Sequence, residues 1–337
     1  MHNANARFSP ELFFDTVNAY FRTAALKTAI ELDLFSAVGE VGITSDALAQ
    51  ACQCSPRGIR ILSDYLVYIG LLCKSGDRYF MTRDMIAVLD KKSPGYLGGT
   101  IDFLLSPEVT EAFADLTRVV RTGEMTRSNN GALDPEHPQW VKFARSMPPM
   151  MTLPSFLLAD LLDGSRQPLK VLDVAAGHGL FGIAFAIQNP RAEVTAVDWA
   201  NVLTVARENA QAAGVIDRFT FLPGDAFAVD FGEGYDIVLF ANFLHHFGKS
   251  KCEEIIAKAH RSLAINGRVA TLEFIANEDR TSPPLAITFS MMMLGTTPAG
   301  EVYSYSDLQQ MFANVGFARS EFHDLHPAIE KVVISYK

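Results

Sequence analysis

The sequence predicts an α/β fold in which a mostly parallel sheet has helices on both faces and follows a smaller, mainly helical region. After Pro168, short segments rich in β-branched residues alternate with segments of helical spacing, as in a parallel sheet whose connections are helices. Between residues 44 and 82, two helical segments precede two short strands around Gly76, the pattern of a winged helix. A chain of 337 residues has room for two domains of ordinary size.

The first third of the chain is predicted to be helical. Apolar side chains recur at helical spacing from Pro10 to Phe35, which predicts one long helix with a buried face. Thr44 and Ser55 are suitable N-caps for a short helix and a longer one. Residues 96–163 have the spacing of further helices.

The last half of the chain is predicted to alternate between strands and helices. Pro190 stops one of the helices, and Gly214 and Gly316 close two others. The strands are expected at residues 170–175, 193–198, 219–225, 235–242 and 268–275, with helices at 180–188, 201–214 and 250–267 between them, then helices near 285–294 and 307–314 and final strands near 317–322 and 331–336.

Composition and charge exclude several classes of protein. The formal net charge of −9 argues against a nucleic-acid binder, because neutralising phosphates needs a basic face. Acidic and basic residues nearly balance over residues 1–105, which argues against DNA binding by the winged helix. No apolar run approaches the roughly 20 residues of a membrane span, so a cytoplasmic protein without membrane contact is expected. The four cysteines form no C-x-x-C pair, so no metal site is expected.

The stretch KVLDVAAGHGLFG, residues 170–182, contains the G-x-G-x-x-G spacing of a nucleotide-binding loop. Asp198 lies where such loops have their ribose-binding acid, which suits NAD and other nucleosides equally. Asp173, just before the loop, would repel a pyrophosphate but would suit the sulfonium and ammonium groups of S-adenosylmethionine. Asp225 follows the next strand and could accept a hydrogen bond from an adenine amino group. Three acids after successive strands favour a cationic nucleoside.

Taken in order, the segments DVAAGHG, GDAF, FLHHF, TLEF and AGEVYS resemble the motifs of class I S-adenosylmethionine-dependent methyltransferases. Within that class, the whole chain is similar to the small-molecule O-methyltransferases that act on plant phenolics or tailor bacterial antibiotics. The resemblance implies a Rossmann-like methyltransferase domain with an antiparallel last strand at residues 166–337, a winged-helix dimerisation domain at 1–105 and connecting helices at 106–165. It implies S-adenosylmethionine as cofactor, bound by Asp173, Gly177, Gly179, Asp198, Trp199, Asp225, Ala226, Phe227 and Phe247.

The resemblance also implies a general base. His245 matches the histidine of the family's H-D-W motif, whereas His246 and Phe247 replace its Asp and Trp. A phenol has a pKa of about 10 and an imidazole one of about 6.5, so the base needs a carboxylate to stabilise its protonated form. Glu273 matches the position of one such acid, and Glu301 matches a second if one residue is inserted.

Two apolar segments are expected to line the acceptor site. Trp140, Phe143 and Met147 lie three and four residues apart on one predicted helix face and resemble the family's acceptor-lining segment. Met291 and Met292 would form the facing wall for a small aromatic or polyketide-like ring. The family's N-terminal domain forms a homodimer with exchanged helices, which the apolar stripe after Pro10 fits.

The sequence leaves three alternative functions open. The first keeps the fold but changes the reaction to carbon methylation or to hydroxylation, decarboxylation or pericyclic chemistry. The second is a transcription regulator that combines a winged helix with a ligand-sensing domain. The third is a nicotinamide oxidoreductase, and a preference for NAD(H) over S-adenosylmethionine would favour it.

Overall fold

The computed structural model describes residues 9–123, 125, 136–162 and 167–337. The chain divides into two compact units, residues 1–101 and 102–337, and each is described by itself. The first unit ends four residues before the expected boundary at 105. The second unit contains both the connecting helices and the predicted methyltransferase domain. Within the described ranges, every helix falls short of the length and apolar character that a membrane span requires.

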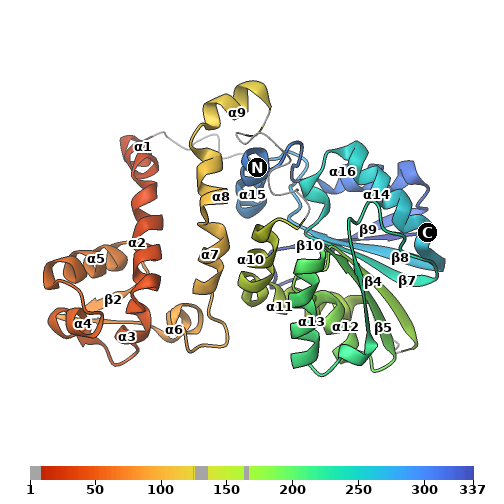
Figure 1. Cartoon of the computed structure of the whole chain (residues 1–337). Helices are drawn as coiled ribbons and strands as arrows, with labels where there is room; N and C mark the ends of the chain where they lie inside the picture. Colours follow the sequence, from red (N-terminus) through yellow and green to blue (C-terminus); the bar gives the residue numbers. More distant parts are fainter. Residues whose placement is uncertain (1–8, 124, 126–135, 163–166) are drawn as a thin grey trace. The chain divides into compact units, whose positions relative to one another are not determined.

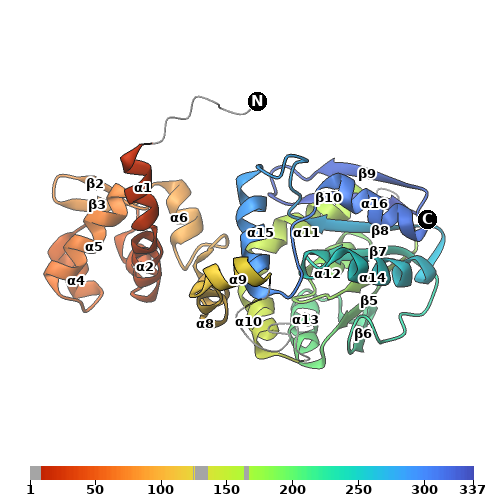
Figure 2. The same cartoon turned by 90° about the horizontal axis from the view of Figure 1, so that it is seen from above.

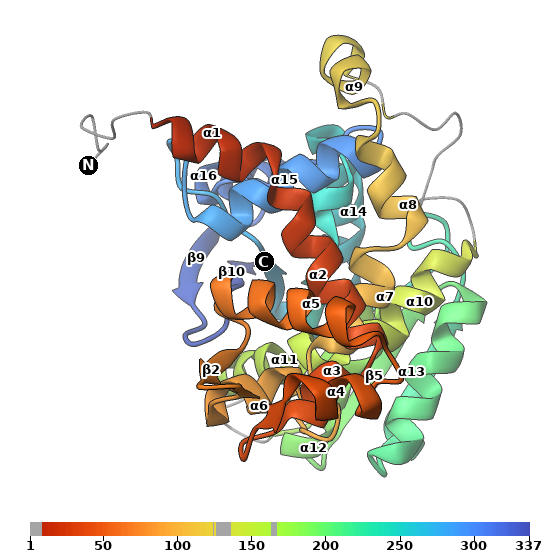
Figure 3. The same cartoon turned by 90° about the vertical axis from the view of Figure 1, so that its left-hand side faces the viewer.

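The first unit begins with three helices where the sequence predicted one. The helices are α1 (Pro10–Val17), α2 (Ala19–Glu31) and α3 (Leu34–Val38). The prediction of one continuous helix was wrong, because Asn18 ends α1 and Asp33 adopts a left-handed backbone with φ of 50°. Figure 3 shows α1 leading into α2 at a bend. The apolar side chains of α1, including Phe13 and Phe14, are exposed within this chain.

The winged-helix pattern is present in the first unit. Thr44 caps α4 (Ser45–Ala51), and Ser55 caps α5 (Pro56–Tyr68), as the sequence predicts. Three short strands form an antiparallel sheet in the order β1 (Ile43–Thr44), β3 (Arg78–Phe80) and β2 (Cys73–Ser75). The unit closes with α6 (Arg83–Leu89) and a 3-10 turn, η1 (Gly98–Thr100).

The second unit is built on a seven-stranded sheet in the order β6-β5-β4-β7-β8-β10-β9 (Figure 1). Five strands run parallel, and β10 pairs antiparallel with both β8 and β9, so the predicted antiparallel last strand is confirmed. The strands are β4 (Leu169–Val174), β5 (Ala192–Asp198), β6 (Phe219–Pro223), β7 (Tyr235–Ala241), β8 (Leu263–Glu273), β9 (Arg319–Asp324) and β10 (Lys331–Tyr336).

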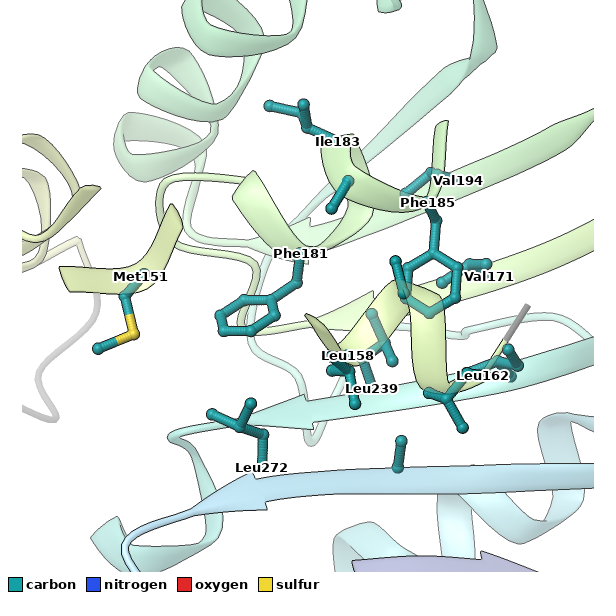
Figure 4. Close-up of a cluster of buried hydrophobic side chains, with 14 of the residues drawn as sticks. Met151, Leu158, Leu162, Val171, Phe181, Ile183, Phe185, Val194, Leu239 and Leu272 are labelled. Atoms are coloured by element: carbon teal, nitrogen blue, oxygen red, sulfur yellow. The ribbon is translucent and has the colours of Figure 1, made fainter. Parts of the chain in front are cut away.

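Helices pack on both faces of this sheet. The helices α11 (Pro148–Leu162), α12 (Leu180–Gln188) and α13 (Ala200–Ala212) cover one face, while α14 (Lys249–Ser262) and α16 (Tyr305–Val315) lie side by side on the other (Figure 2). In the core on the first face, Leu158 of α11 and Phe181 of α12 lie against Leu239 of β7 (Figure 4). Further helices are α7 (Ile101–Leu104), α8 (Pro107–Thr110), η2 (Glu111–Phe113), α9 (Leu116–Thr122), α10 (Pro138–Ser146) and α15 (Pro284–Thr296).

Candidate active site

The glycine-rich loop joins β4 to α12 at the carboxyl edge of the sheet. Gly177 and Gly179 have φ of 57° and 75°, which glycine adopts without strain. A Cβ on Gly179 would lie 3.0 Å from Ala206 Cβ, and a Cβ on Gly182 would lie 2.6 Å from Val194 Cγ1. Gly182 therefore lets α12 pack closely against the sheet.

Asp173, on β4, is hydrogen-bonded to the backbone at the start of α12. Its side chain is only 1 % exposed, and its Oδ2 accepts a hydrogen bond from Gly182 N–H at 3.1 Å. Burial raises its pKa to about 7. Its carboxylate does not line the cavity beside the loop, so the expectation that it faces a cationic ligand is corrected: the strand buries this side chain, and it braces the backbone.

A cavity of about 290 Å³ opens beside this loop, and Asp198 stands at the end of β5 on its wall. The Asp198 carboxylate accepts hydrogen bonds from Gly177 N–H at 2.8 Å and Trp199 N–H at 2.7 Å. Burial raises its pKa to about 6. The other lining residues are Trp140, Phe143, Ala175, Gly177, Trp199, Val202, Gly224, Asp225, Ala226, Phe227, Ala241, Asn242, Phe243, His246, Phe247 and Lys251. Gly179 is not among them.

The lining of this cavity also includes the acid Asp225 and the aromatic rings of Phe227 and Phe247. Asp225 accepts a hydrogen bond from Phe227 N–H at 2.9 Å, and the rings of Phe227 and Phe247 meet edge to face with centroids 5.0 Å apart. The ammonium of Lys251 lies 4.2 Å from the centroid of the Phe227 ring. Sequence reasoning missed Lys251. The signal available in the sequence was its position in the first turn of the helix that follows the FLHHF segment.

His245 and Glu273 form a buried pair at the carboxyl edges of β7 and β8. One Glu273 oxygen, Oε2, is hydrogen-bonded to Nδ1 of His245. The other, Oε1, accepts hydrogen bonds from the backbone N–H groups of Phe243 and Leu244, at 3.0 and 2.9 Å. One carboxylate therefore holds both the histidine ring and the turn that carries it.

Glu301 is placed differently from Glu273. Its side chain is 43 % exposed, and its Oε2 lies 3.2 Å from Arg280 Nη1. It lines neither of the two cavities at this edge of the sheet. The structure therefore pairs Glu301 with Arg280 and does not bring its carboxylate to His245.

A second cavity, of about 220 Å³, adjoins the first, and His245 is one of its lining residues. Trp140, Phe143, Met147 and Met292 line it, as expected. Its other lining residues are Phe103, Leu104, Val109, Gln139, Met150, Met151, Asn242, His245, His246, Phe274, Leu285, Thr288, Phe289, Met293, Thr296, Thr297 and Ile329.

The placement of Met291 in this wall was wrong. Met291 is 46 % exposed, whereas Met293 is 3 % exposed and lines the second cavity with Met292. Positions 285, 288, 289, 292, 293 and 296 of α15 share the face that lines the cavity. Met291 lies outside this stripe because successive helical residues are about 100° apart.

The two cavities share four lining residues: Trp140, Phe143, Asn242 and His246. The Trp140 and His246 rings meet edge to face, with centroids 5.3 Å apart. Burial and the neighbouring His245 lower the pKa of His246 well below its usual value, so this ring is neutral at physiological pH. Sequence reasoning assigned no role to Asn242, although it lies three residues before His245.

Comparison with known proteins decides between the alternatives left open by the sequence. The O-methyltransferase domain matches residues 142–318, more than half of the chain. The chain belongs to the O-methyltransferase family. The prediction of an S-adenosylmethionine-dependent O-methyltransferase is therefore confirmed, as is its Rossmann-like fold. In this O-methyltransferase, residues 14–84 match the dimerisation domain of the same family.

Solved structures and curated relatives agree with this assignment of the O-methyltransferase. A crystal structure of a protein from Nostoc punctiforme that is classed as an O-methyltransferase has 49 % identity and a TM-score of 0.96, covering 98 % of this chain and 100 % of its own. The tetracenomycin polyketide synthesis 8-O-methyltransferase of Streptomyces glaucescens is 27 % identical over 89 % of this chain and 88 % of its own length. The 3-hydroxy-5-methyl-1-naphthoate 3-O-methyltransferase of Streptomyces sahachiroi is 28 % identical over 85 % of this chain and 83 % of its own.

Proposed function

We propose that this enzyme transfers a methyl group from S-adenosylmethionine to a hydroxyl of a small aromatic or polyketide-like molecule, with His245 as general base. One observation carries the proposal: His245, hydrogen-bonded to Glu273, lines the apolar cavity next to the cavity of the glycine-rich loop. In-line displacement requires the methyl donor to lie next to the acceptor hydroxyl, and two adjoining cavities can hold the donor and the acceptor side by side.

The first cavity fits the cofactor by the chemistry of its walls. Asp198 would accept hydrogen bonds from ribose hydroxyls, and Gly177 leaves room because it has no side chain. Asp225 would accept a hydrogen bond from the adenine amino group, and Ala226, Phe227 and Phe247 line the cavity beside it. When bound, S-adenosylmethionine supplies a methyl group activated by the positive sulfonium.

The His245 ring takes the proton of the acceptor hydroxyl. Because Glu273 binds Nδ1, the neutral ring carries its hydrogen there and leaves Nε2 free as the base. The same carboxylate stabilises the imidazolium that forms when Nε2 takes the proton. Holding the two reactants in place supplies much of the acceleration, roughly 7 to 11 kcal/mol for well-oriented pairs.

The second cavity favours a flat, apolar acceptor. Its walls combine aromatic rings with five methionines, whose flexible side chains adapt to ring systems of different outline. The two Streptomyces relatives are named for a polyketide and a naphthoate acceptor. An aromatic or polyketide-like hydroxyl compound therefore fits both the walls and the family.

The first unit serves as a homodimer interface in this proposal. Leu12, Phe13, Phe14 and Val17 expose more than half of their surface on α1, and this stretch overlaps the matched dimerisation domain. A contiguous exposed apolar surface indicates an interaction site. Gel filtration with light scattering is expected to give the mass of two chains, and a single-chain mass at micromolar concentration would contradict the interface.

Two measurements test the reaction. Thermal unfolding should shift upward with S-adenosylmethionine or S-adenosylhomocysteine but not with NAD(H), because a ligand that binds only the folded state stabilises it. His245→Ala should lower kcat for methyl transfer by about 10²-fold to 10⁴-fold, the usual contribution of a general base. Turnover near the wild-type rate would refute the role of His245 but not that of the cofactor cavity.

A further inference from the structure

The boundary between the two cavities holds polar atoms that the proposed mechanism does not use. Asn242 and His246 line both cavities, and Asn242 Oδ1 and His246 Nδ1 are buried without a hydrogen-bond partner. Among the described residues that line the acceptor cavity, these are the unpaired buried side-chain polar atoms. Since buried polar atoms in native proteins nearly always have partners, a bound molecule is expected to supply them.

Asn242 is held firmly in this position. It follows β7 with φ of 53°, a left-handed conformation that asparagine tolerates better than most residues. Its backbone N–H donates to Leu272 O at 2.8 Å, and its side-chain Nδ2 donates to Met151 Sδ at 3.4 Å. With the amide nitrogen occupied, the carbonyl oxygen is the group left to meet a ligand.

Away from this boundary, the polar side chains among the described lining residues are His245, Gln139 and three threonines. Among the described residues that line the acceptor cavity, there is no Asp, Glu, Lys or Arg. The hydroxyls of Thr288, Thr296 and Thr297 already donate to backbone carbonyls of α15, at 2.9, 2.8 and 2.7 Å. A charged acceptor would therefore lose its hydration without gaining a counterion, which is costly.

We propose that Asn242 Oδ1 accepts a hydrogen bond from a second O–H or N–H group of the acceptor, next to the hydroxyl that gives its proton to His245. The enzyme then selects neutral acceptors with two adjacent donors, as in a catechol-like or peri-dihydroxy ring system. This inference rests on the proposed function, because it takes the second cavity to hold the acceptor. The neutral His246 ring lies beside the same boundary and does not add a positive charge there.

The test is calorimetric titration of three bicyclic probes into the protein saturated with S-adenosylhomocysteine. The probes are 2,3-dihydroxynaphthalene, 2-naphthol, which lacks the second donor, and 3-hydroxy-2-naphthoate, which replaces it with a negative charge. The diol is expected to bind about tenfold more tightly than 2-naphthol, since leaving a buried acceptor unpaired is costly. The naphthoate is expected to bind most weakly.

Variants locate the preference at Asn242. Asn242→Gly keeps the left-handed backbone and should bind the diol and 2-naphthol equally. Asn242→Leu refills the space and should do the same. Thr288→Val is the matched control. It removes a hydroxyl from the same cavity, but that hydroxyl already donates to the Pro284 carbonyl, so this variant should still bind the diol more tightly than 2-naphthol.

The outcomes separate this inference from the proposed function. Absence of S-adenosylhomocysteine binding would count against the proposed function itself. If the cofactor product binds, the inference alone is overturned when no probe binds, when wild type binds the diol no more tightly than 2-naphthol, or when the preference survives in both Asn242 variants.

Discussion

The Glu273 carboxylate joins the His245 ring to the turn on which that ring is mounted. One oxygen is hydrogen-bonded to His245 Nδ1, and the other accepts two backbone N–H groups of the preceding residues. All of these groups are buried, and Glu273 supplies the hydrogen bond that orients the His245 ring. The same side chain therefore affects both the stability of the turn and the chemistry.

Glu273→Gln should lower kcat by about 10²-fold or more while leaving KM nearly unchanged. Gln can still accept the two backbone N–H groups, but its amide would donate to His245 Nδ1 and move the ring hydrogen to Nε2, which then cannot take a proton. Steady-state kinetics checks this result.

Glu301→Gln is the matched control for Glu273→Gln. Its carboxylate pairs with Arg280 on an exposed surface, and such pairs contribute about 0 to 1 kcal/mol. Because so weak an exposed pair contributes little, kcat of Glu301→Gln should stay within about threefold of the wild-type value. If kcat of Glu301→Gln fell as far as kcat of Glu273→Gln, Glu301 would have a catalytic role after all.

Binding of S-adenosylhomocysteine should weaken as the pH falls below about 6. Burial raises the pKa of Asp198 to about 6 in the free protein, and the ionised carboxylate is the form that accepts hydrogen bonds from the ligand. Below pH 6 the group must first release a proton, so Kd should rise up to about tenfold per pH unit. Calorimetry between pH 5 and 7 measures this change. Asp198→Asn should bind weakly with no such dependence, and a constant wild-type Kd would argue against the role of Asp198.

Asp173 should make the folded protein less stable as the pH rises from about 4 to 7. Its pKa is raised to about 7 in the folded chain, against about 3.9 when unfolded, so the folded state binds more protons in this window. The free energy of unfolding should fall by up to about 1.4 kcal/mol per pH unit on this account.

Asp173→Asn removes this titration while keeping an oxygen for the Gly182 N–H. Relative to wild type, its stability should therefore increase between pH 4.5 and 7.5. Urea unfolding of both proteins at the two pH values compares them. Parallel changes in the two proteins would show that Asp173 does not titrate in this window.

Met292→Ala should raise KM for the acceptor severalfold, whereas Met291→Ala should leave it unchanged. Met292 lines the second cavity. Removing a buried methionine side chain costs about 2 to 5 kcal/mol in protein cores, and a fraction of that cost is expected where the side chain is only partly buried. Met291 is exposed on the same helix, outside the stripe that lines the cavity. Equal effects from these neighbouring residues would contradict the orientation of α15.

Much of the site could be predicted from sequence because its residues follow strands. Asp198, Asp225, His245 and Glu273 come at or just after the ends of strands whose apolar residues identify them, and the carboxyl ends of parallel strands share one edge. Their approximate neighbourhood therefore followed from the strand assignments. The break at Asn18 did not, because the apolar spacing continues across it.

The sequence by itself determined the alternation of strands and helices in the second unit, the glycine-rich loop, the positions of His245 and Glu273 at the ends of strands and the family to which the chain belongs. The tertiary structure decided which face of α15 lines the second cavity, that Asp173 holds the loop backbone, that Glu301 pairs with Arg280 and that Asn242 lines both cavities. The physical reason is that local spacing specifies a periodicity but not its phase. Which side chain faces a cavity and which faces a neighbouring chain segment is set by contacts between residues far apart in the sequence.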